Sequence, residues 1–160
     1  MKSKQFIYLG ILLQMLLLTS CENKIIISDS KKISNSVWNI DEAVKLELNV
    51  VDVSKFYNLY INIDVKEDFL TNNLWIFLST SSPSGNVQND TLIYYVTDEK
   101  GKWFGNKNGD IIKNKFLYKP NIKFSEVGTY KFTISHGMRE MDLPKVEIVG
   151  VIAEETLKSE

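Results

Sequence analysis

The sequence predicts an all-β fold, a single antiparallel β-sandwich of about seven to eight strands, immunoglobulin-like or jelly-roll-like. Three observations predict it. Apolar and polar residues alternate with a period of two along most of the chain, and no segment longer than a turn or two has a helical period. Turn-forming residues separate these segments at spacings of roughly 8 to 15 residues, and one segment has the spacing of a tyrosine corner.

The first 20 residues have the order of a secretory signal peptide. Two lysines precede an apolar run from residue 6 to 18, and small residues lead to Ser20 and the sole cysteine, Cys21. This order predicts cleavage between Ser20 and Cys21 and a diacylglycerol group joined to the Cys21 sulfur by a thioether, with acyl chains such as palmitate. We therefore expect a bacterial lipoprotein anchored in the cell envelope, at the outer membrane, and the sequence does not choose between its leaflets.

The lipoprotein interpretation has two alternatives. An uncleaved transmembrane anchor of thirteen residues would span only about 20 Å, against a hydrocarbon core of about 30 Å. An ordinary secreted protein, with Cys21 as a plain first residue, is the second alternative. In either case a single cysteine excludes a disulfide within the chain and a site built from several thiolates.

The mature chain has the length of one domain. Residues 21–36 are expected to form a lipidated N-terminus, a tether and a first strand, 37–153 the β-sandwich, and 154–160 a charged tail. Without the two signal-peptide lysines, 17 basic side chains stand against 20 acidic ones. This weak acidic excess argues against nucleic acid as a partner.

The predicted strands follow from the alternation and the turns between them. Residues 74–78 differ, because Leu-Trp-Ile-Phe-Leu is apolar on both faces. This composition indicates either a strand covered on two sides or one whose outward face meets a partner. Pro83 and Gly85 mark the turn that follows, and residues 98–101 mark the next hairpin turn. The predicted strands are 25–27, 44–50, 59–65, 74–78, 91–96, 116–124, 128–135 and 146–152.

The segment from Glu126 to Phe132 has the spacing of a tyrosine corner. In such a corner the glycine, here Gly128, permits a tight bend, and the tyrosine hydroxyl, here Tyr130, bonds to backbone upstream. Alternation then predicts that Tyr130, Phe132 and Ile134 point inward and that Lys131 and Thr133 point outward.

Few residues carry the chemistry of a catalytic or metal site, and we predict no enzyme, no cofactor and no metal. His136, the sole histidine, continues the inward side of its strand, which favours a structural role; a Ser-His-acid triad is the alternative. Asn106, Asn108 and Asp110 alternate around glycines, which favours a plain turn over an oxygen-ligand calcium site. A glycosidase pair formed by acids distant in the chain stays open.

The segment 101–110 places Trp103 and Phe104 among three glycines in a predicted loop. Packing of these rings under the loop is the simpler interpretation, and binding of a partner is the other. Aromatic platforms also stack on sugar rings, so a cell-surface carbohydrate-binding module is the alternative function.

Several short motifs occur in a characteristic order from about Trp38 to Ile152. They are Asn58-Leu59-Tyr60-Ile61-Asn62-Ile63, Asn72-Asn73-Leu74, Pro83-Ser84-Gly85, Asp90-Thr91-Leu92, Trp103 between Gly101 and Gly105, Gly109-Asp110, Phe124 with Gly128-Thr129-Tyr130, and Met138-Arg139.

Together with Cys21, these motifs resemble the gliding-motility lipoprotein GldH family of Bacteroidota. The chain departs from the family's pattern at Asp64, Phe69-Leu70 and Pro144-Lys145. The resemblance implies a non-enzymatic lipoprotein that supports gliding and is associated with the type IX secretion machinery. We expect it to act as a membrane-tethered assembly or stabilising component with other envelope proteins as partners. The candidate contact residues are Trp103, Phe104, Gly105, Asp110, Met138 and Arg139.

Overall fold

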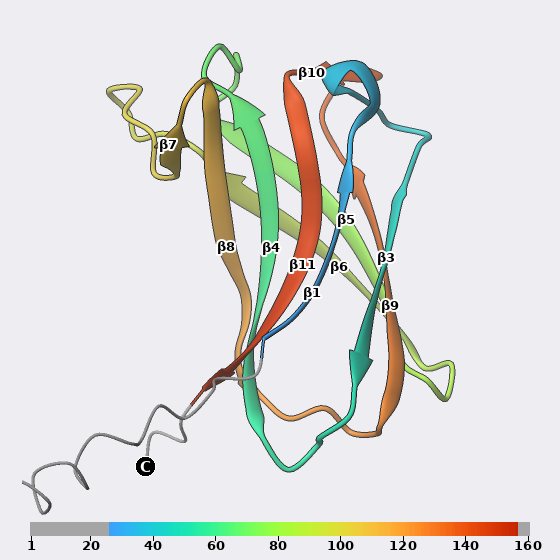
Figure 1. Ribbon diagram of the computed structural model, residues 1–160. Helices are drawn as coiled ribbons and strands as arrows, with labels where there is room; N and C mark the ends of the chain where they lie inside the picture. Colours follow the sequence, from blue (N-terminus) through green and yellow to red (C-terminus); the bar gives the residue numbers. More distant parts are fainter. Residues whose placement is uncertain (1–25, 157–160) are drawn as a thin grey trace, which may run out of the picture.

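The computed structural model describes residues 26–156 as two antiparallel sheets packed face to face (Figure 1). One sheet has the strand order β1-β11-β4-β8-β7, the other β3-β9-β5-β6, and a small third sheet pairs β10 with β2. This arrangement confirms the predicted all-β sandwich. The elements are β1 (Ile26–Lys32), a 3₁₀ turn (Ser34–Ser36), β2 (Val37–Asn39), β3 (Val44–Val50), β4 (Phe56–Lys66), β5 (Asn73–Ser81), β6 (Val87–Tyr95), β7 (Asn106–Asn108), β8 (Ile111–Ile122), β9 (Gly128–His136), β10 (Asp142–Pro144) and β11 (Val146–Thr156).

The described residues form eleven strands, more than the seven or eight predicted. The difference is β2, β7 and β10, each three residues long and therefore too short for an alternation pattern to identify. Strand β11 also continues to Thr156, into the segment assigned to a charged tail, because Glu154 to Thr156 pair with Asn58 to Phe56 of β4. No helix within residues 26–156 is long and apolar enough to cross a membrane.

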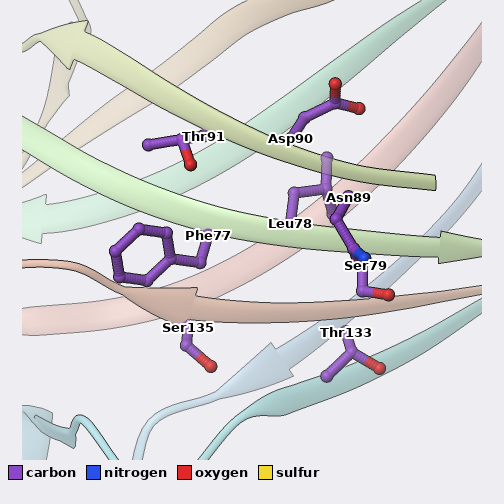
Figure 2. A pocket seen from close by; sticks show the side chains of 8 residues that line it. All are labelled: Phe77, Leu78, Ser79, Asn89, Asp90, Thr91, Thr133 and Ser135. Atoms are coloured by element: carbon purple, nitrogen blue, oxygen red, sulfur yellow. The ribbon is translucent and has the colours of Figure 1, made fainter.

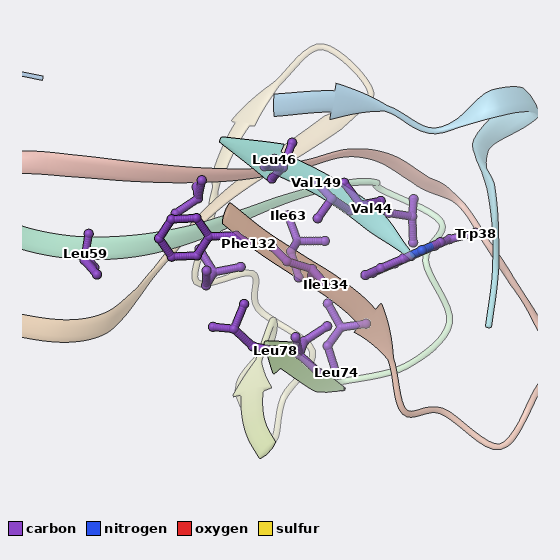
Figure 3. Packing of buried hydrophobic residues seen from close by; sticks show 14 of the residues in the cluster. Trp38, Val44, Leu46, Leu59, Ile63, Leu74, Leu78, Phe132, Ile134 and Val149 are labelled. Atoms are coloured by element: carbon purple, nitrogen blue, oxygen red, sulfur yellow. The ribbon is translucent and has the colours of Figure 1, made fainter. Parts of the chain in front are cut away.

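The core lies between the inward faces of the two large sheets (Figure 3). Alternation directs every second side chain of β3 into this space, so the burial pattern of Val44–Val50 is strictly buried and exposed in turn. Strand β9 follows the same rule and confirms the predicted inward row Tyr130, Phe132 and Ile134. The residues labelled in Figure 3 come from both sheets and from β2: Trp38, Val44, Leu46, Leu59, Ile63, Leu74, Leu78, Phe132, Ile134 and Val149.

The predicted tyrosine corner is confirmed. The Tyr130 hydroxyl donates to the Glu126 carbonyl oxygen at 3.2 Å and accepts from the Glu126 amide at 3.2 Å. Gly128 has φ of 133°, and a Cβ there would lie 2.9 Å from the Pro83 ring, so only glycine fits this bend. The corner thus joins the start of β9 to the turn between β5 and β6.

The sandwich has two distinct ends. At one end, which we call the proximal end, β1 begins opposite the last residues of β11, with Ile26 paired to Glu154. At the other, the distal end, Lys66 of β4 pairs with Ile111 of β8, and Val146 of β11 pairs with Val65. Figure 1 shows the start of β1 and the end of β11 together at the bottom of the molecule. The described chain therefore begins and ends at the proximal end.

Candidate functional site

Strands β5 and β6 present an aromatic face to solvent. Leu74, Ile76 and Leu78 fill the core, so the residues between them point outward. Trp75 lies directly opposite Ile93 in the β5–β6 ladder, and Phe77 and Tyr95 extend the row along each strand. We call these four residues the aromatic face; their exposed fractions are Trp75 44%, Phe77 49%, Ile93 39% and Tyr95 54%.

The aromatic face resolves the two interpretations of residues 74–78. Both sides of β5 are apolar, as the sequence indicates, but within residues 26–156 no second layer covers the outward side. Exposed aromatic side chains that adjoin one another are typical of interaction surfaces rather than of stable free surface. The strand is therefore one whose outward face is available to a partner.

The neighbouring strand β9 supports the aromatic face from one side. A Cβ at Gly137 would lie 2.8 Å from the Phe77 ring, so the ring rests on the glycine backbone. The Gly137 amide donates to the Trp75 carbonyl oxygen at 2.7 Å, and the Met138 sulfur lies 3.4 Å from the Trp75 amide nitrogen. These contacts fix the backbone of Trp75 and support one side of the Phe77 ring, although about half of each side chain is in water.

A hollow adjoins Phe77 on the same outward surface (Figure 2). Its volume is about 310 Å³, at the lower end of the range for small-ligand sites. One aromatic ring and several hydroxyl and amide groups line it, an arrangement that could hold a polar, uncharged group against a ring. The lining residues are Phe77, Leu78, Ser79, Asn89, Asp90, Thr91, Thr133 and Ser135.

The loop that carries Trp103 and Phe104 lies at the distal end of the sandwich. Trp103 pairs with Thr97 in an isolated bridge and packs against the core, whereas Phe104 is 64% exposed. A Cβ at Gly105 would approach the Lys113 carbonyl oxygen to 2.7 Å, so this glycine permits a close approach to β8. Asp110 is exposed, and its carbonyl oxygen accepts from the Glu67 amide at 2.8 Å.

Met138 and Arg139 lie in the segment between β9 and β10. Met138 packs against the core and touches the backbone of β5 beside Trp75, so it adjoins the aromatic face. Arg139 is exposed. Of the six predicted contact residues, the structure thus ties Met138 to β5, places the other five in exposed or half-buried loops, and reveals an apolar surface that the prediction did not include.

His136 is completely buried at the end of β9, on the inward side as predicted. Its ring meets the Trp38 ring edge-on, with centroids 5.3 Å apart, and Nδ1 accepts from the Met138 amide at 3.4 Å. Among residues 26–156, Nε2 finds no hydrogen-bond partner. Burial lowers the pKa of His136, opposed by the backbone of Trp38 and Met141, which favours a neutral ring within the core.

The remaining predicted sites have these positions. Ser20 and Cys21 lie outside the described residues. Asn106 and Asn108 belong to β7, which pairs with the start of β8, and both are exposed. Within residues 26–156, no three His, Cys, Asp or Glu side chains are grouped as ligands for a metal ion.

Comparison with known proteins decides the family. The family model described as GldH lipoprotein matches residues 25–152, nearly the whole sandwich. This chain belongs to the GldH lipoprotein family. It is 37% identical over 125 residues to a gliding motility lipoprotein GldH homolog of Christiangramia forsetii, covering 78% of this chain and 76% of the relative. It is 34% identical over 145 residues to gliding motility lipoprotein GldH of Flavobacterium johnsoniae, covering 90% and 89%.

Solved structures resemble this GldH-family chain only distantly. An arabinose-bound α-L-arabinofuranosidase aligns with 84% of this chain and 23% of its own at 10% identity, with a TM-score of 0.36. An exo-β-1,3-galactanase of Phanerochaete chrysosporium bound to galactose aligns with 84% and 28% at 13% identity, with a TM-score of 0.32. Neither similarity is sufficient to support an inference about activity.

Asp64 lies on β4, opposite Lys113 of β8. The carboxyl group is buried, and burial raises the pKa of Asp64 while Lys113 and the Asn114 amide partly oppose the rise. Asp64 is therefore a feature of the β4–β8 pairing and lies in the sheet that does not carry the aromatic face.

Proposed function

We propose that this protein is a non-enzymatic lipoprotein of the outer membrane that supports gliding motility and the associated type IX secretion machinery. It would act as a membrane-tethered component that assembles or stabilises a complex of envelope proteins. The observation that carries this proposal is the GldH family match over residues 25–152, directly preceded by a cysteine in the sequence context of lipidation.

The geometry supports tethering at the proximal end. Only five residue steps separate Cys21 from Ile26, and a chain of that length spans at most about 18 Å. The eleven residues of β4 extend roughly 35 Å from the proximal to the distal end. An acylated Cys21 would thus keep the proximal end near the bilayer and direct the distal loops away from it.

Tethering also explains how a domain without catalytic chemistry can act. Confinement to a membrane raises the effective concentration of the domain toward other anchored components, so a modest contact surface suffices for assembly. We propose the aromatic face as this contact surface. Met138, one of the predicted contact residues, adjoins this face at the Trp75 backbone amide.

Replacement of the lipidated thiol tests the proposal. In Cys21→Ser cells, we expect the precursor to remain unprocessed at residue 20, the protein to leave the outer-membrane fraction, and gliding to stop. Cell fractionation with single-cell gliding measurements provides the readout, and Ser3→Ala in the same leader is the control. If Cys21→Ser cells retain membrane-bound protein of mature size and normal gliding, the proposal fails.

The distal loop offers a second, separable test of partner contact. Trp103→Ala removes a half-buried ring, so it combines a folding effect with any effect on binding. Phe104→Ala removes an exposed ring from the same loop and isolates the contact. If Phe104→Ala cells glide normally with unchanged protein levels, this loop is not a contact that motility requires.

Carbohydrate binding is a second candidate function, favoured by the hollow beside Phe77. An exposed ring bordered by Ser79, Asn89 and Thr133 offers stacking and neutral hydrogen-bonding groups together, as saccharides require. A glycan array with the full-length lipoprotein in detergent tests this function. A signal that Phe77→Thr abolishes would support it, and an empty array would exclude the glycans tested.

A further inference from the structure

We propose that the free edge of β6 is a docking site for an extended strand of a partner protein, which would add to the β3-β9-β5-β6 sheet. This inference deepens the proposed function and rests on it for the location of the partner in the envelope. It concerns the backbone edge of the sheet, whereas the aromatic face is formed by side chains. Strand addition of this kind satisfies main-chain groups that an edge strand leaves unpaired.

The hydrogen-bonding pattern identifies which β6 residues face the free edge. Just beyond one end of the β5–β6 ladder, the Ser82 amide donates to the Asn86 carbonyl oxygen at 2.9 Å. Just beyond the other end, the Val96 amide donates to the Asn72 carbonyl oxygen, also at 2.9 Å. Because hydrogen-bonded pairs alternate along an antiparallel ladder, the even-numbered residues of β6 pair with β5. The amides and carbonyls of the odd-numbered residues therefore point to the free edge.

Nothing in the described chain occupies that edge. Strand β6 is the last strand of its sheet, and its nine-residue register with β5 has no bulge. All five odd-numbered side chains are exposed and uncharged, and β6 contains no proline or lysine. Natural edge strands are usually protected from pairing by proline, by lysine or by β-bulges. The odd-numbered residues are Val87, Asn89, Thr91, Ile93 and Tyr95.

The other sheet edges of residues 26–156 have the protection that β6 lacks. Strands β1 and β3 lie against each other, and the Asp29 carboxylate accepts from the Glu47 amide at 2.8 Å. Strand β8 is partly covered by β7, carries Pro120, and has irregular register with β4 near Leu59. Among the long strands at the sheet edges of residues 26–156, β6 is thus an exception.

The inward side of β6 is fixed, so its edge is ready for pairing without rearrangement. The Tyr94 ring stacks on Phe116 of β8 with centroids 4.4 Å apart and planes inclined by 8°. The Asp90 carboxylate accepts a hydrogen bond from the Tyr118 hydroxyl. Burial raises the pKa of Tyr94 to about 12, consistent with a ring enclosed between the sheets. A preformed edge reduces the ordering cost of strand addition.

The orientation of the anchor argues against a second copy as the occupant. Two β6 strands paired antiparallel are related by a two-fold axis perpendicular to the strands. That axis inverts one copy, so the proximal ends at Ile26 would point in opposite directions and could not both approach one bilayer. The geometry instead favours an extended segment of a different protein, with uncharged, apolar side chains against Ile93 and Tyr95.

In-cell photocrosslinking tests this proposal with the full-length, lipidated protein. A benzophenone amino acid is placed in turn at Asn89, Thr91 and Ile93, and at Glu47 on the protected edge as a control. We expect the same heterologous adduct from the three β6 positions and none from position 47. Adducts from positions 89 and 93 should weaken about tenfold with Thr91→Pro, as expected for loss of one backbone hydrogen bond of about 1.4 kcal/mol.

Thr91→Val is the matched control for Thr91→Pro. It removes the same hydroxyl group but keeps the backbone amide that points to the free edge. We expect it to change adduct yield less than about twofold. Proline fits the free side of an edge strand, and equal membrane levels of the two variants verify that folding is intact. An adduct that persists with Thr91→Pro, an adduct of two copies of this chain, or no adduct in gliding cells would each overturn the proposal. None of these outcomes alters the Cys21→Ser result that tests anchoring.

Discussion

The outward surface of the β3-β9-β5-β6 sheet has two unlike halves. On β3 and β9 the outward residues include Lys45, Glu47 and Lys131, a surface typical of a solvated sheet face. On β5 and β6 the corresponding positions carry the aromatic face. Strands β3, β9 and β5 each contribute a buried apolar row to the core, so the core does not account for the difference between the outward sides of these strands. We infer that the aromatic half is retained for contact with a partner.

A pair of neighbouring residues on β9 sharpens the distinction between inward and outward positions. Phe132→Ala should destabilise the protein by about 3–5 kcal/mol, because the ring is fully buried and its loss leaves a cavity between the sheets. Thr133→Ala, one residue further and outward, should cost less than about 1 kcal/mol. Urea unfolding of the two variants measures both values. Equal effects would contradict the assignment of sheet faces.

The tyrosine corner tests how much its hydrogen bonds contribute to the stability of the sandwich. Tyr130→Phe removes the hydroxyl that bonds the Glu126 backbone while keeping the buried ring. We expect a loss of about 1–2 kcal/mol, since the Glu126 groups lose a partner but can reach water. Thermal unfolding provides the measurement, with Tyr95→Phe on the aromatic face as the control. No difference between the two variants would show that the corner is dispensable.

The buried carboxyl group of Asp64, in the sheet that contains β4, is expected to destabilise the folded protein at neutral pH. The pKa of Asp64 in the folded protein is raised above the ordinary value of 3.8. Between these two pKa values the folded state binds more protons than the unfolded state, so the free energy of unfolding falls as the pH rises through this range. Asp64→Asn should therefore raise the unfolding temperature at pH 7 by roughly a few degrees, with little gain near pH 3.5. Unfolding scans at both pH values check this. A less stable variant at pH 7 would show that the electrostatic attraction between Asp64 and Lys113 outweighs the cost of burying the carboxylate.

The smallest effect on stability is expected at the aromatic face itself. Phe77→Thr removes a half-exposed ring and introduces a good strand former, so unfolding free energy should change by less than about 1 kcal/mol. Lys45→Thr on the polar half of the same surface is the matched control. A loss as large as that of Phe132→Ala would mean that Phe77 serves the fold rather than a partner.

The sequence predicted the frame of the molecule well for physical reasons. Alternation in residues 44–50 and 128–135 reports burial directly, and Tyr130 with Gly128 forms a local motif whose geometry depends on few neighbours. The turn at Gly85 was equally local, since its φ of 89° requires glycine. Family membership also followed from motif order along the chain.

The interaction surface could not be predicted in the same way, because it depends on pairing between strands. Residues 74–78 showed two apolar faces, but only the sheet order leaves the outward one uncovered and places Trp75 opposite Ile93. The free edge of β6 has no local signature, since it results from the absence of a neighbouring strand in the described chain. Trp103 packs against the core, as the simpler of its two sequence interpretations predicts, whereas no local signal marks Trp75 as exposed.

The most direct test of the central claim compares the two halves of the outward surface in gliding cells. Trp75→Thr with Phe77→Thr is compared with Lys45→Thr and Lys131→Thr, and single-cell gliding speed is measured at equal levels of membrane-bound protein. We predict that the aromatic double variant stops gliding while remaining folded and anchored, and that the lysine double variant glides normally. Normal gliding of the folded aromatic variant would contradict the account.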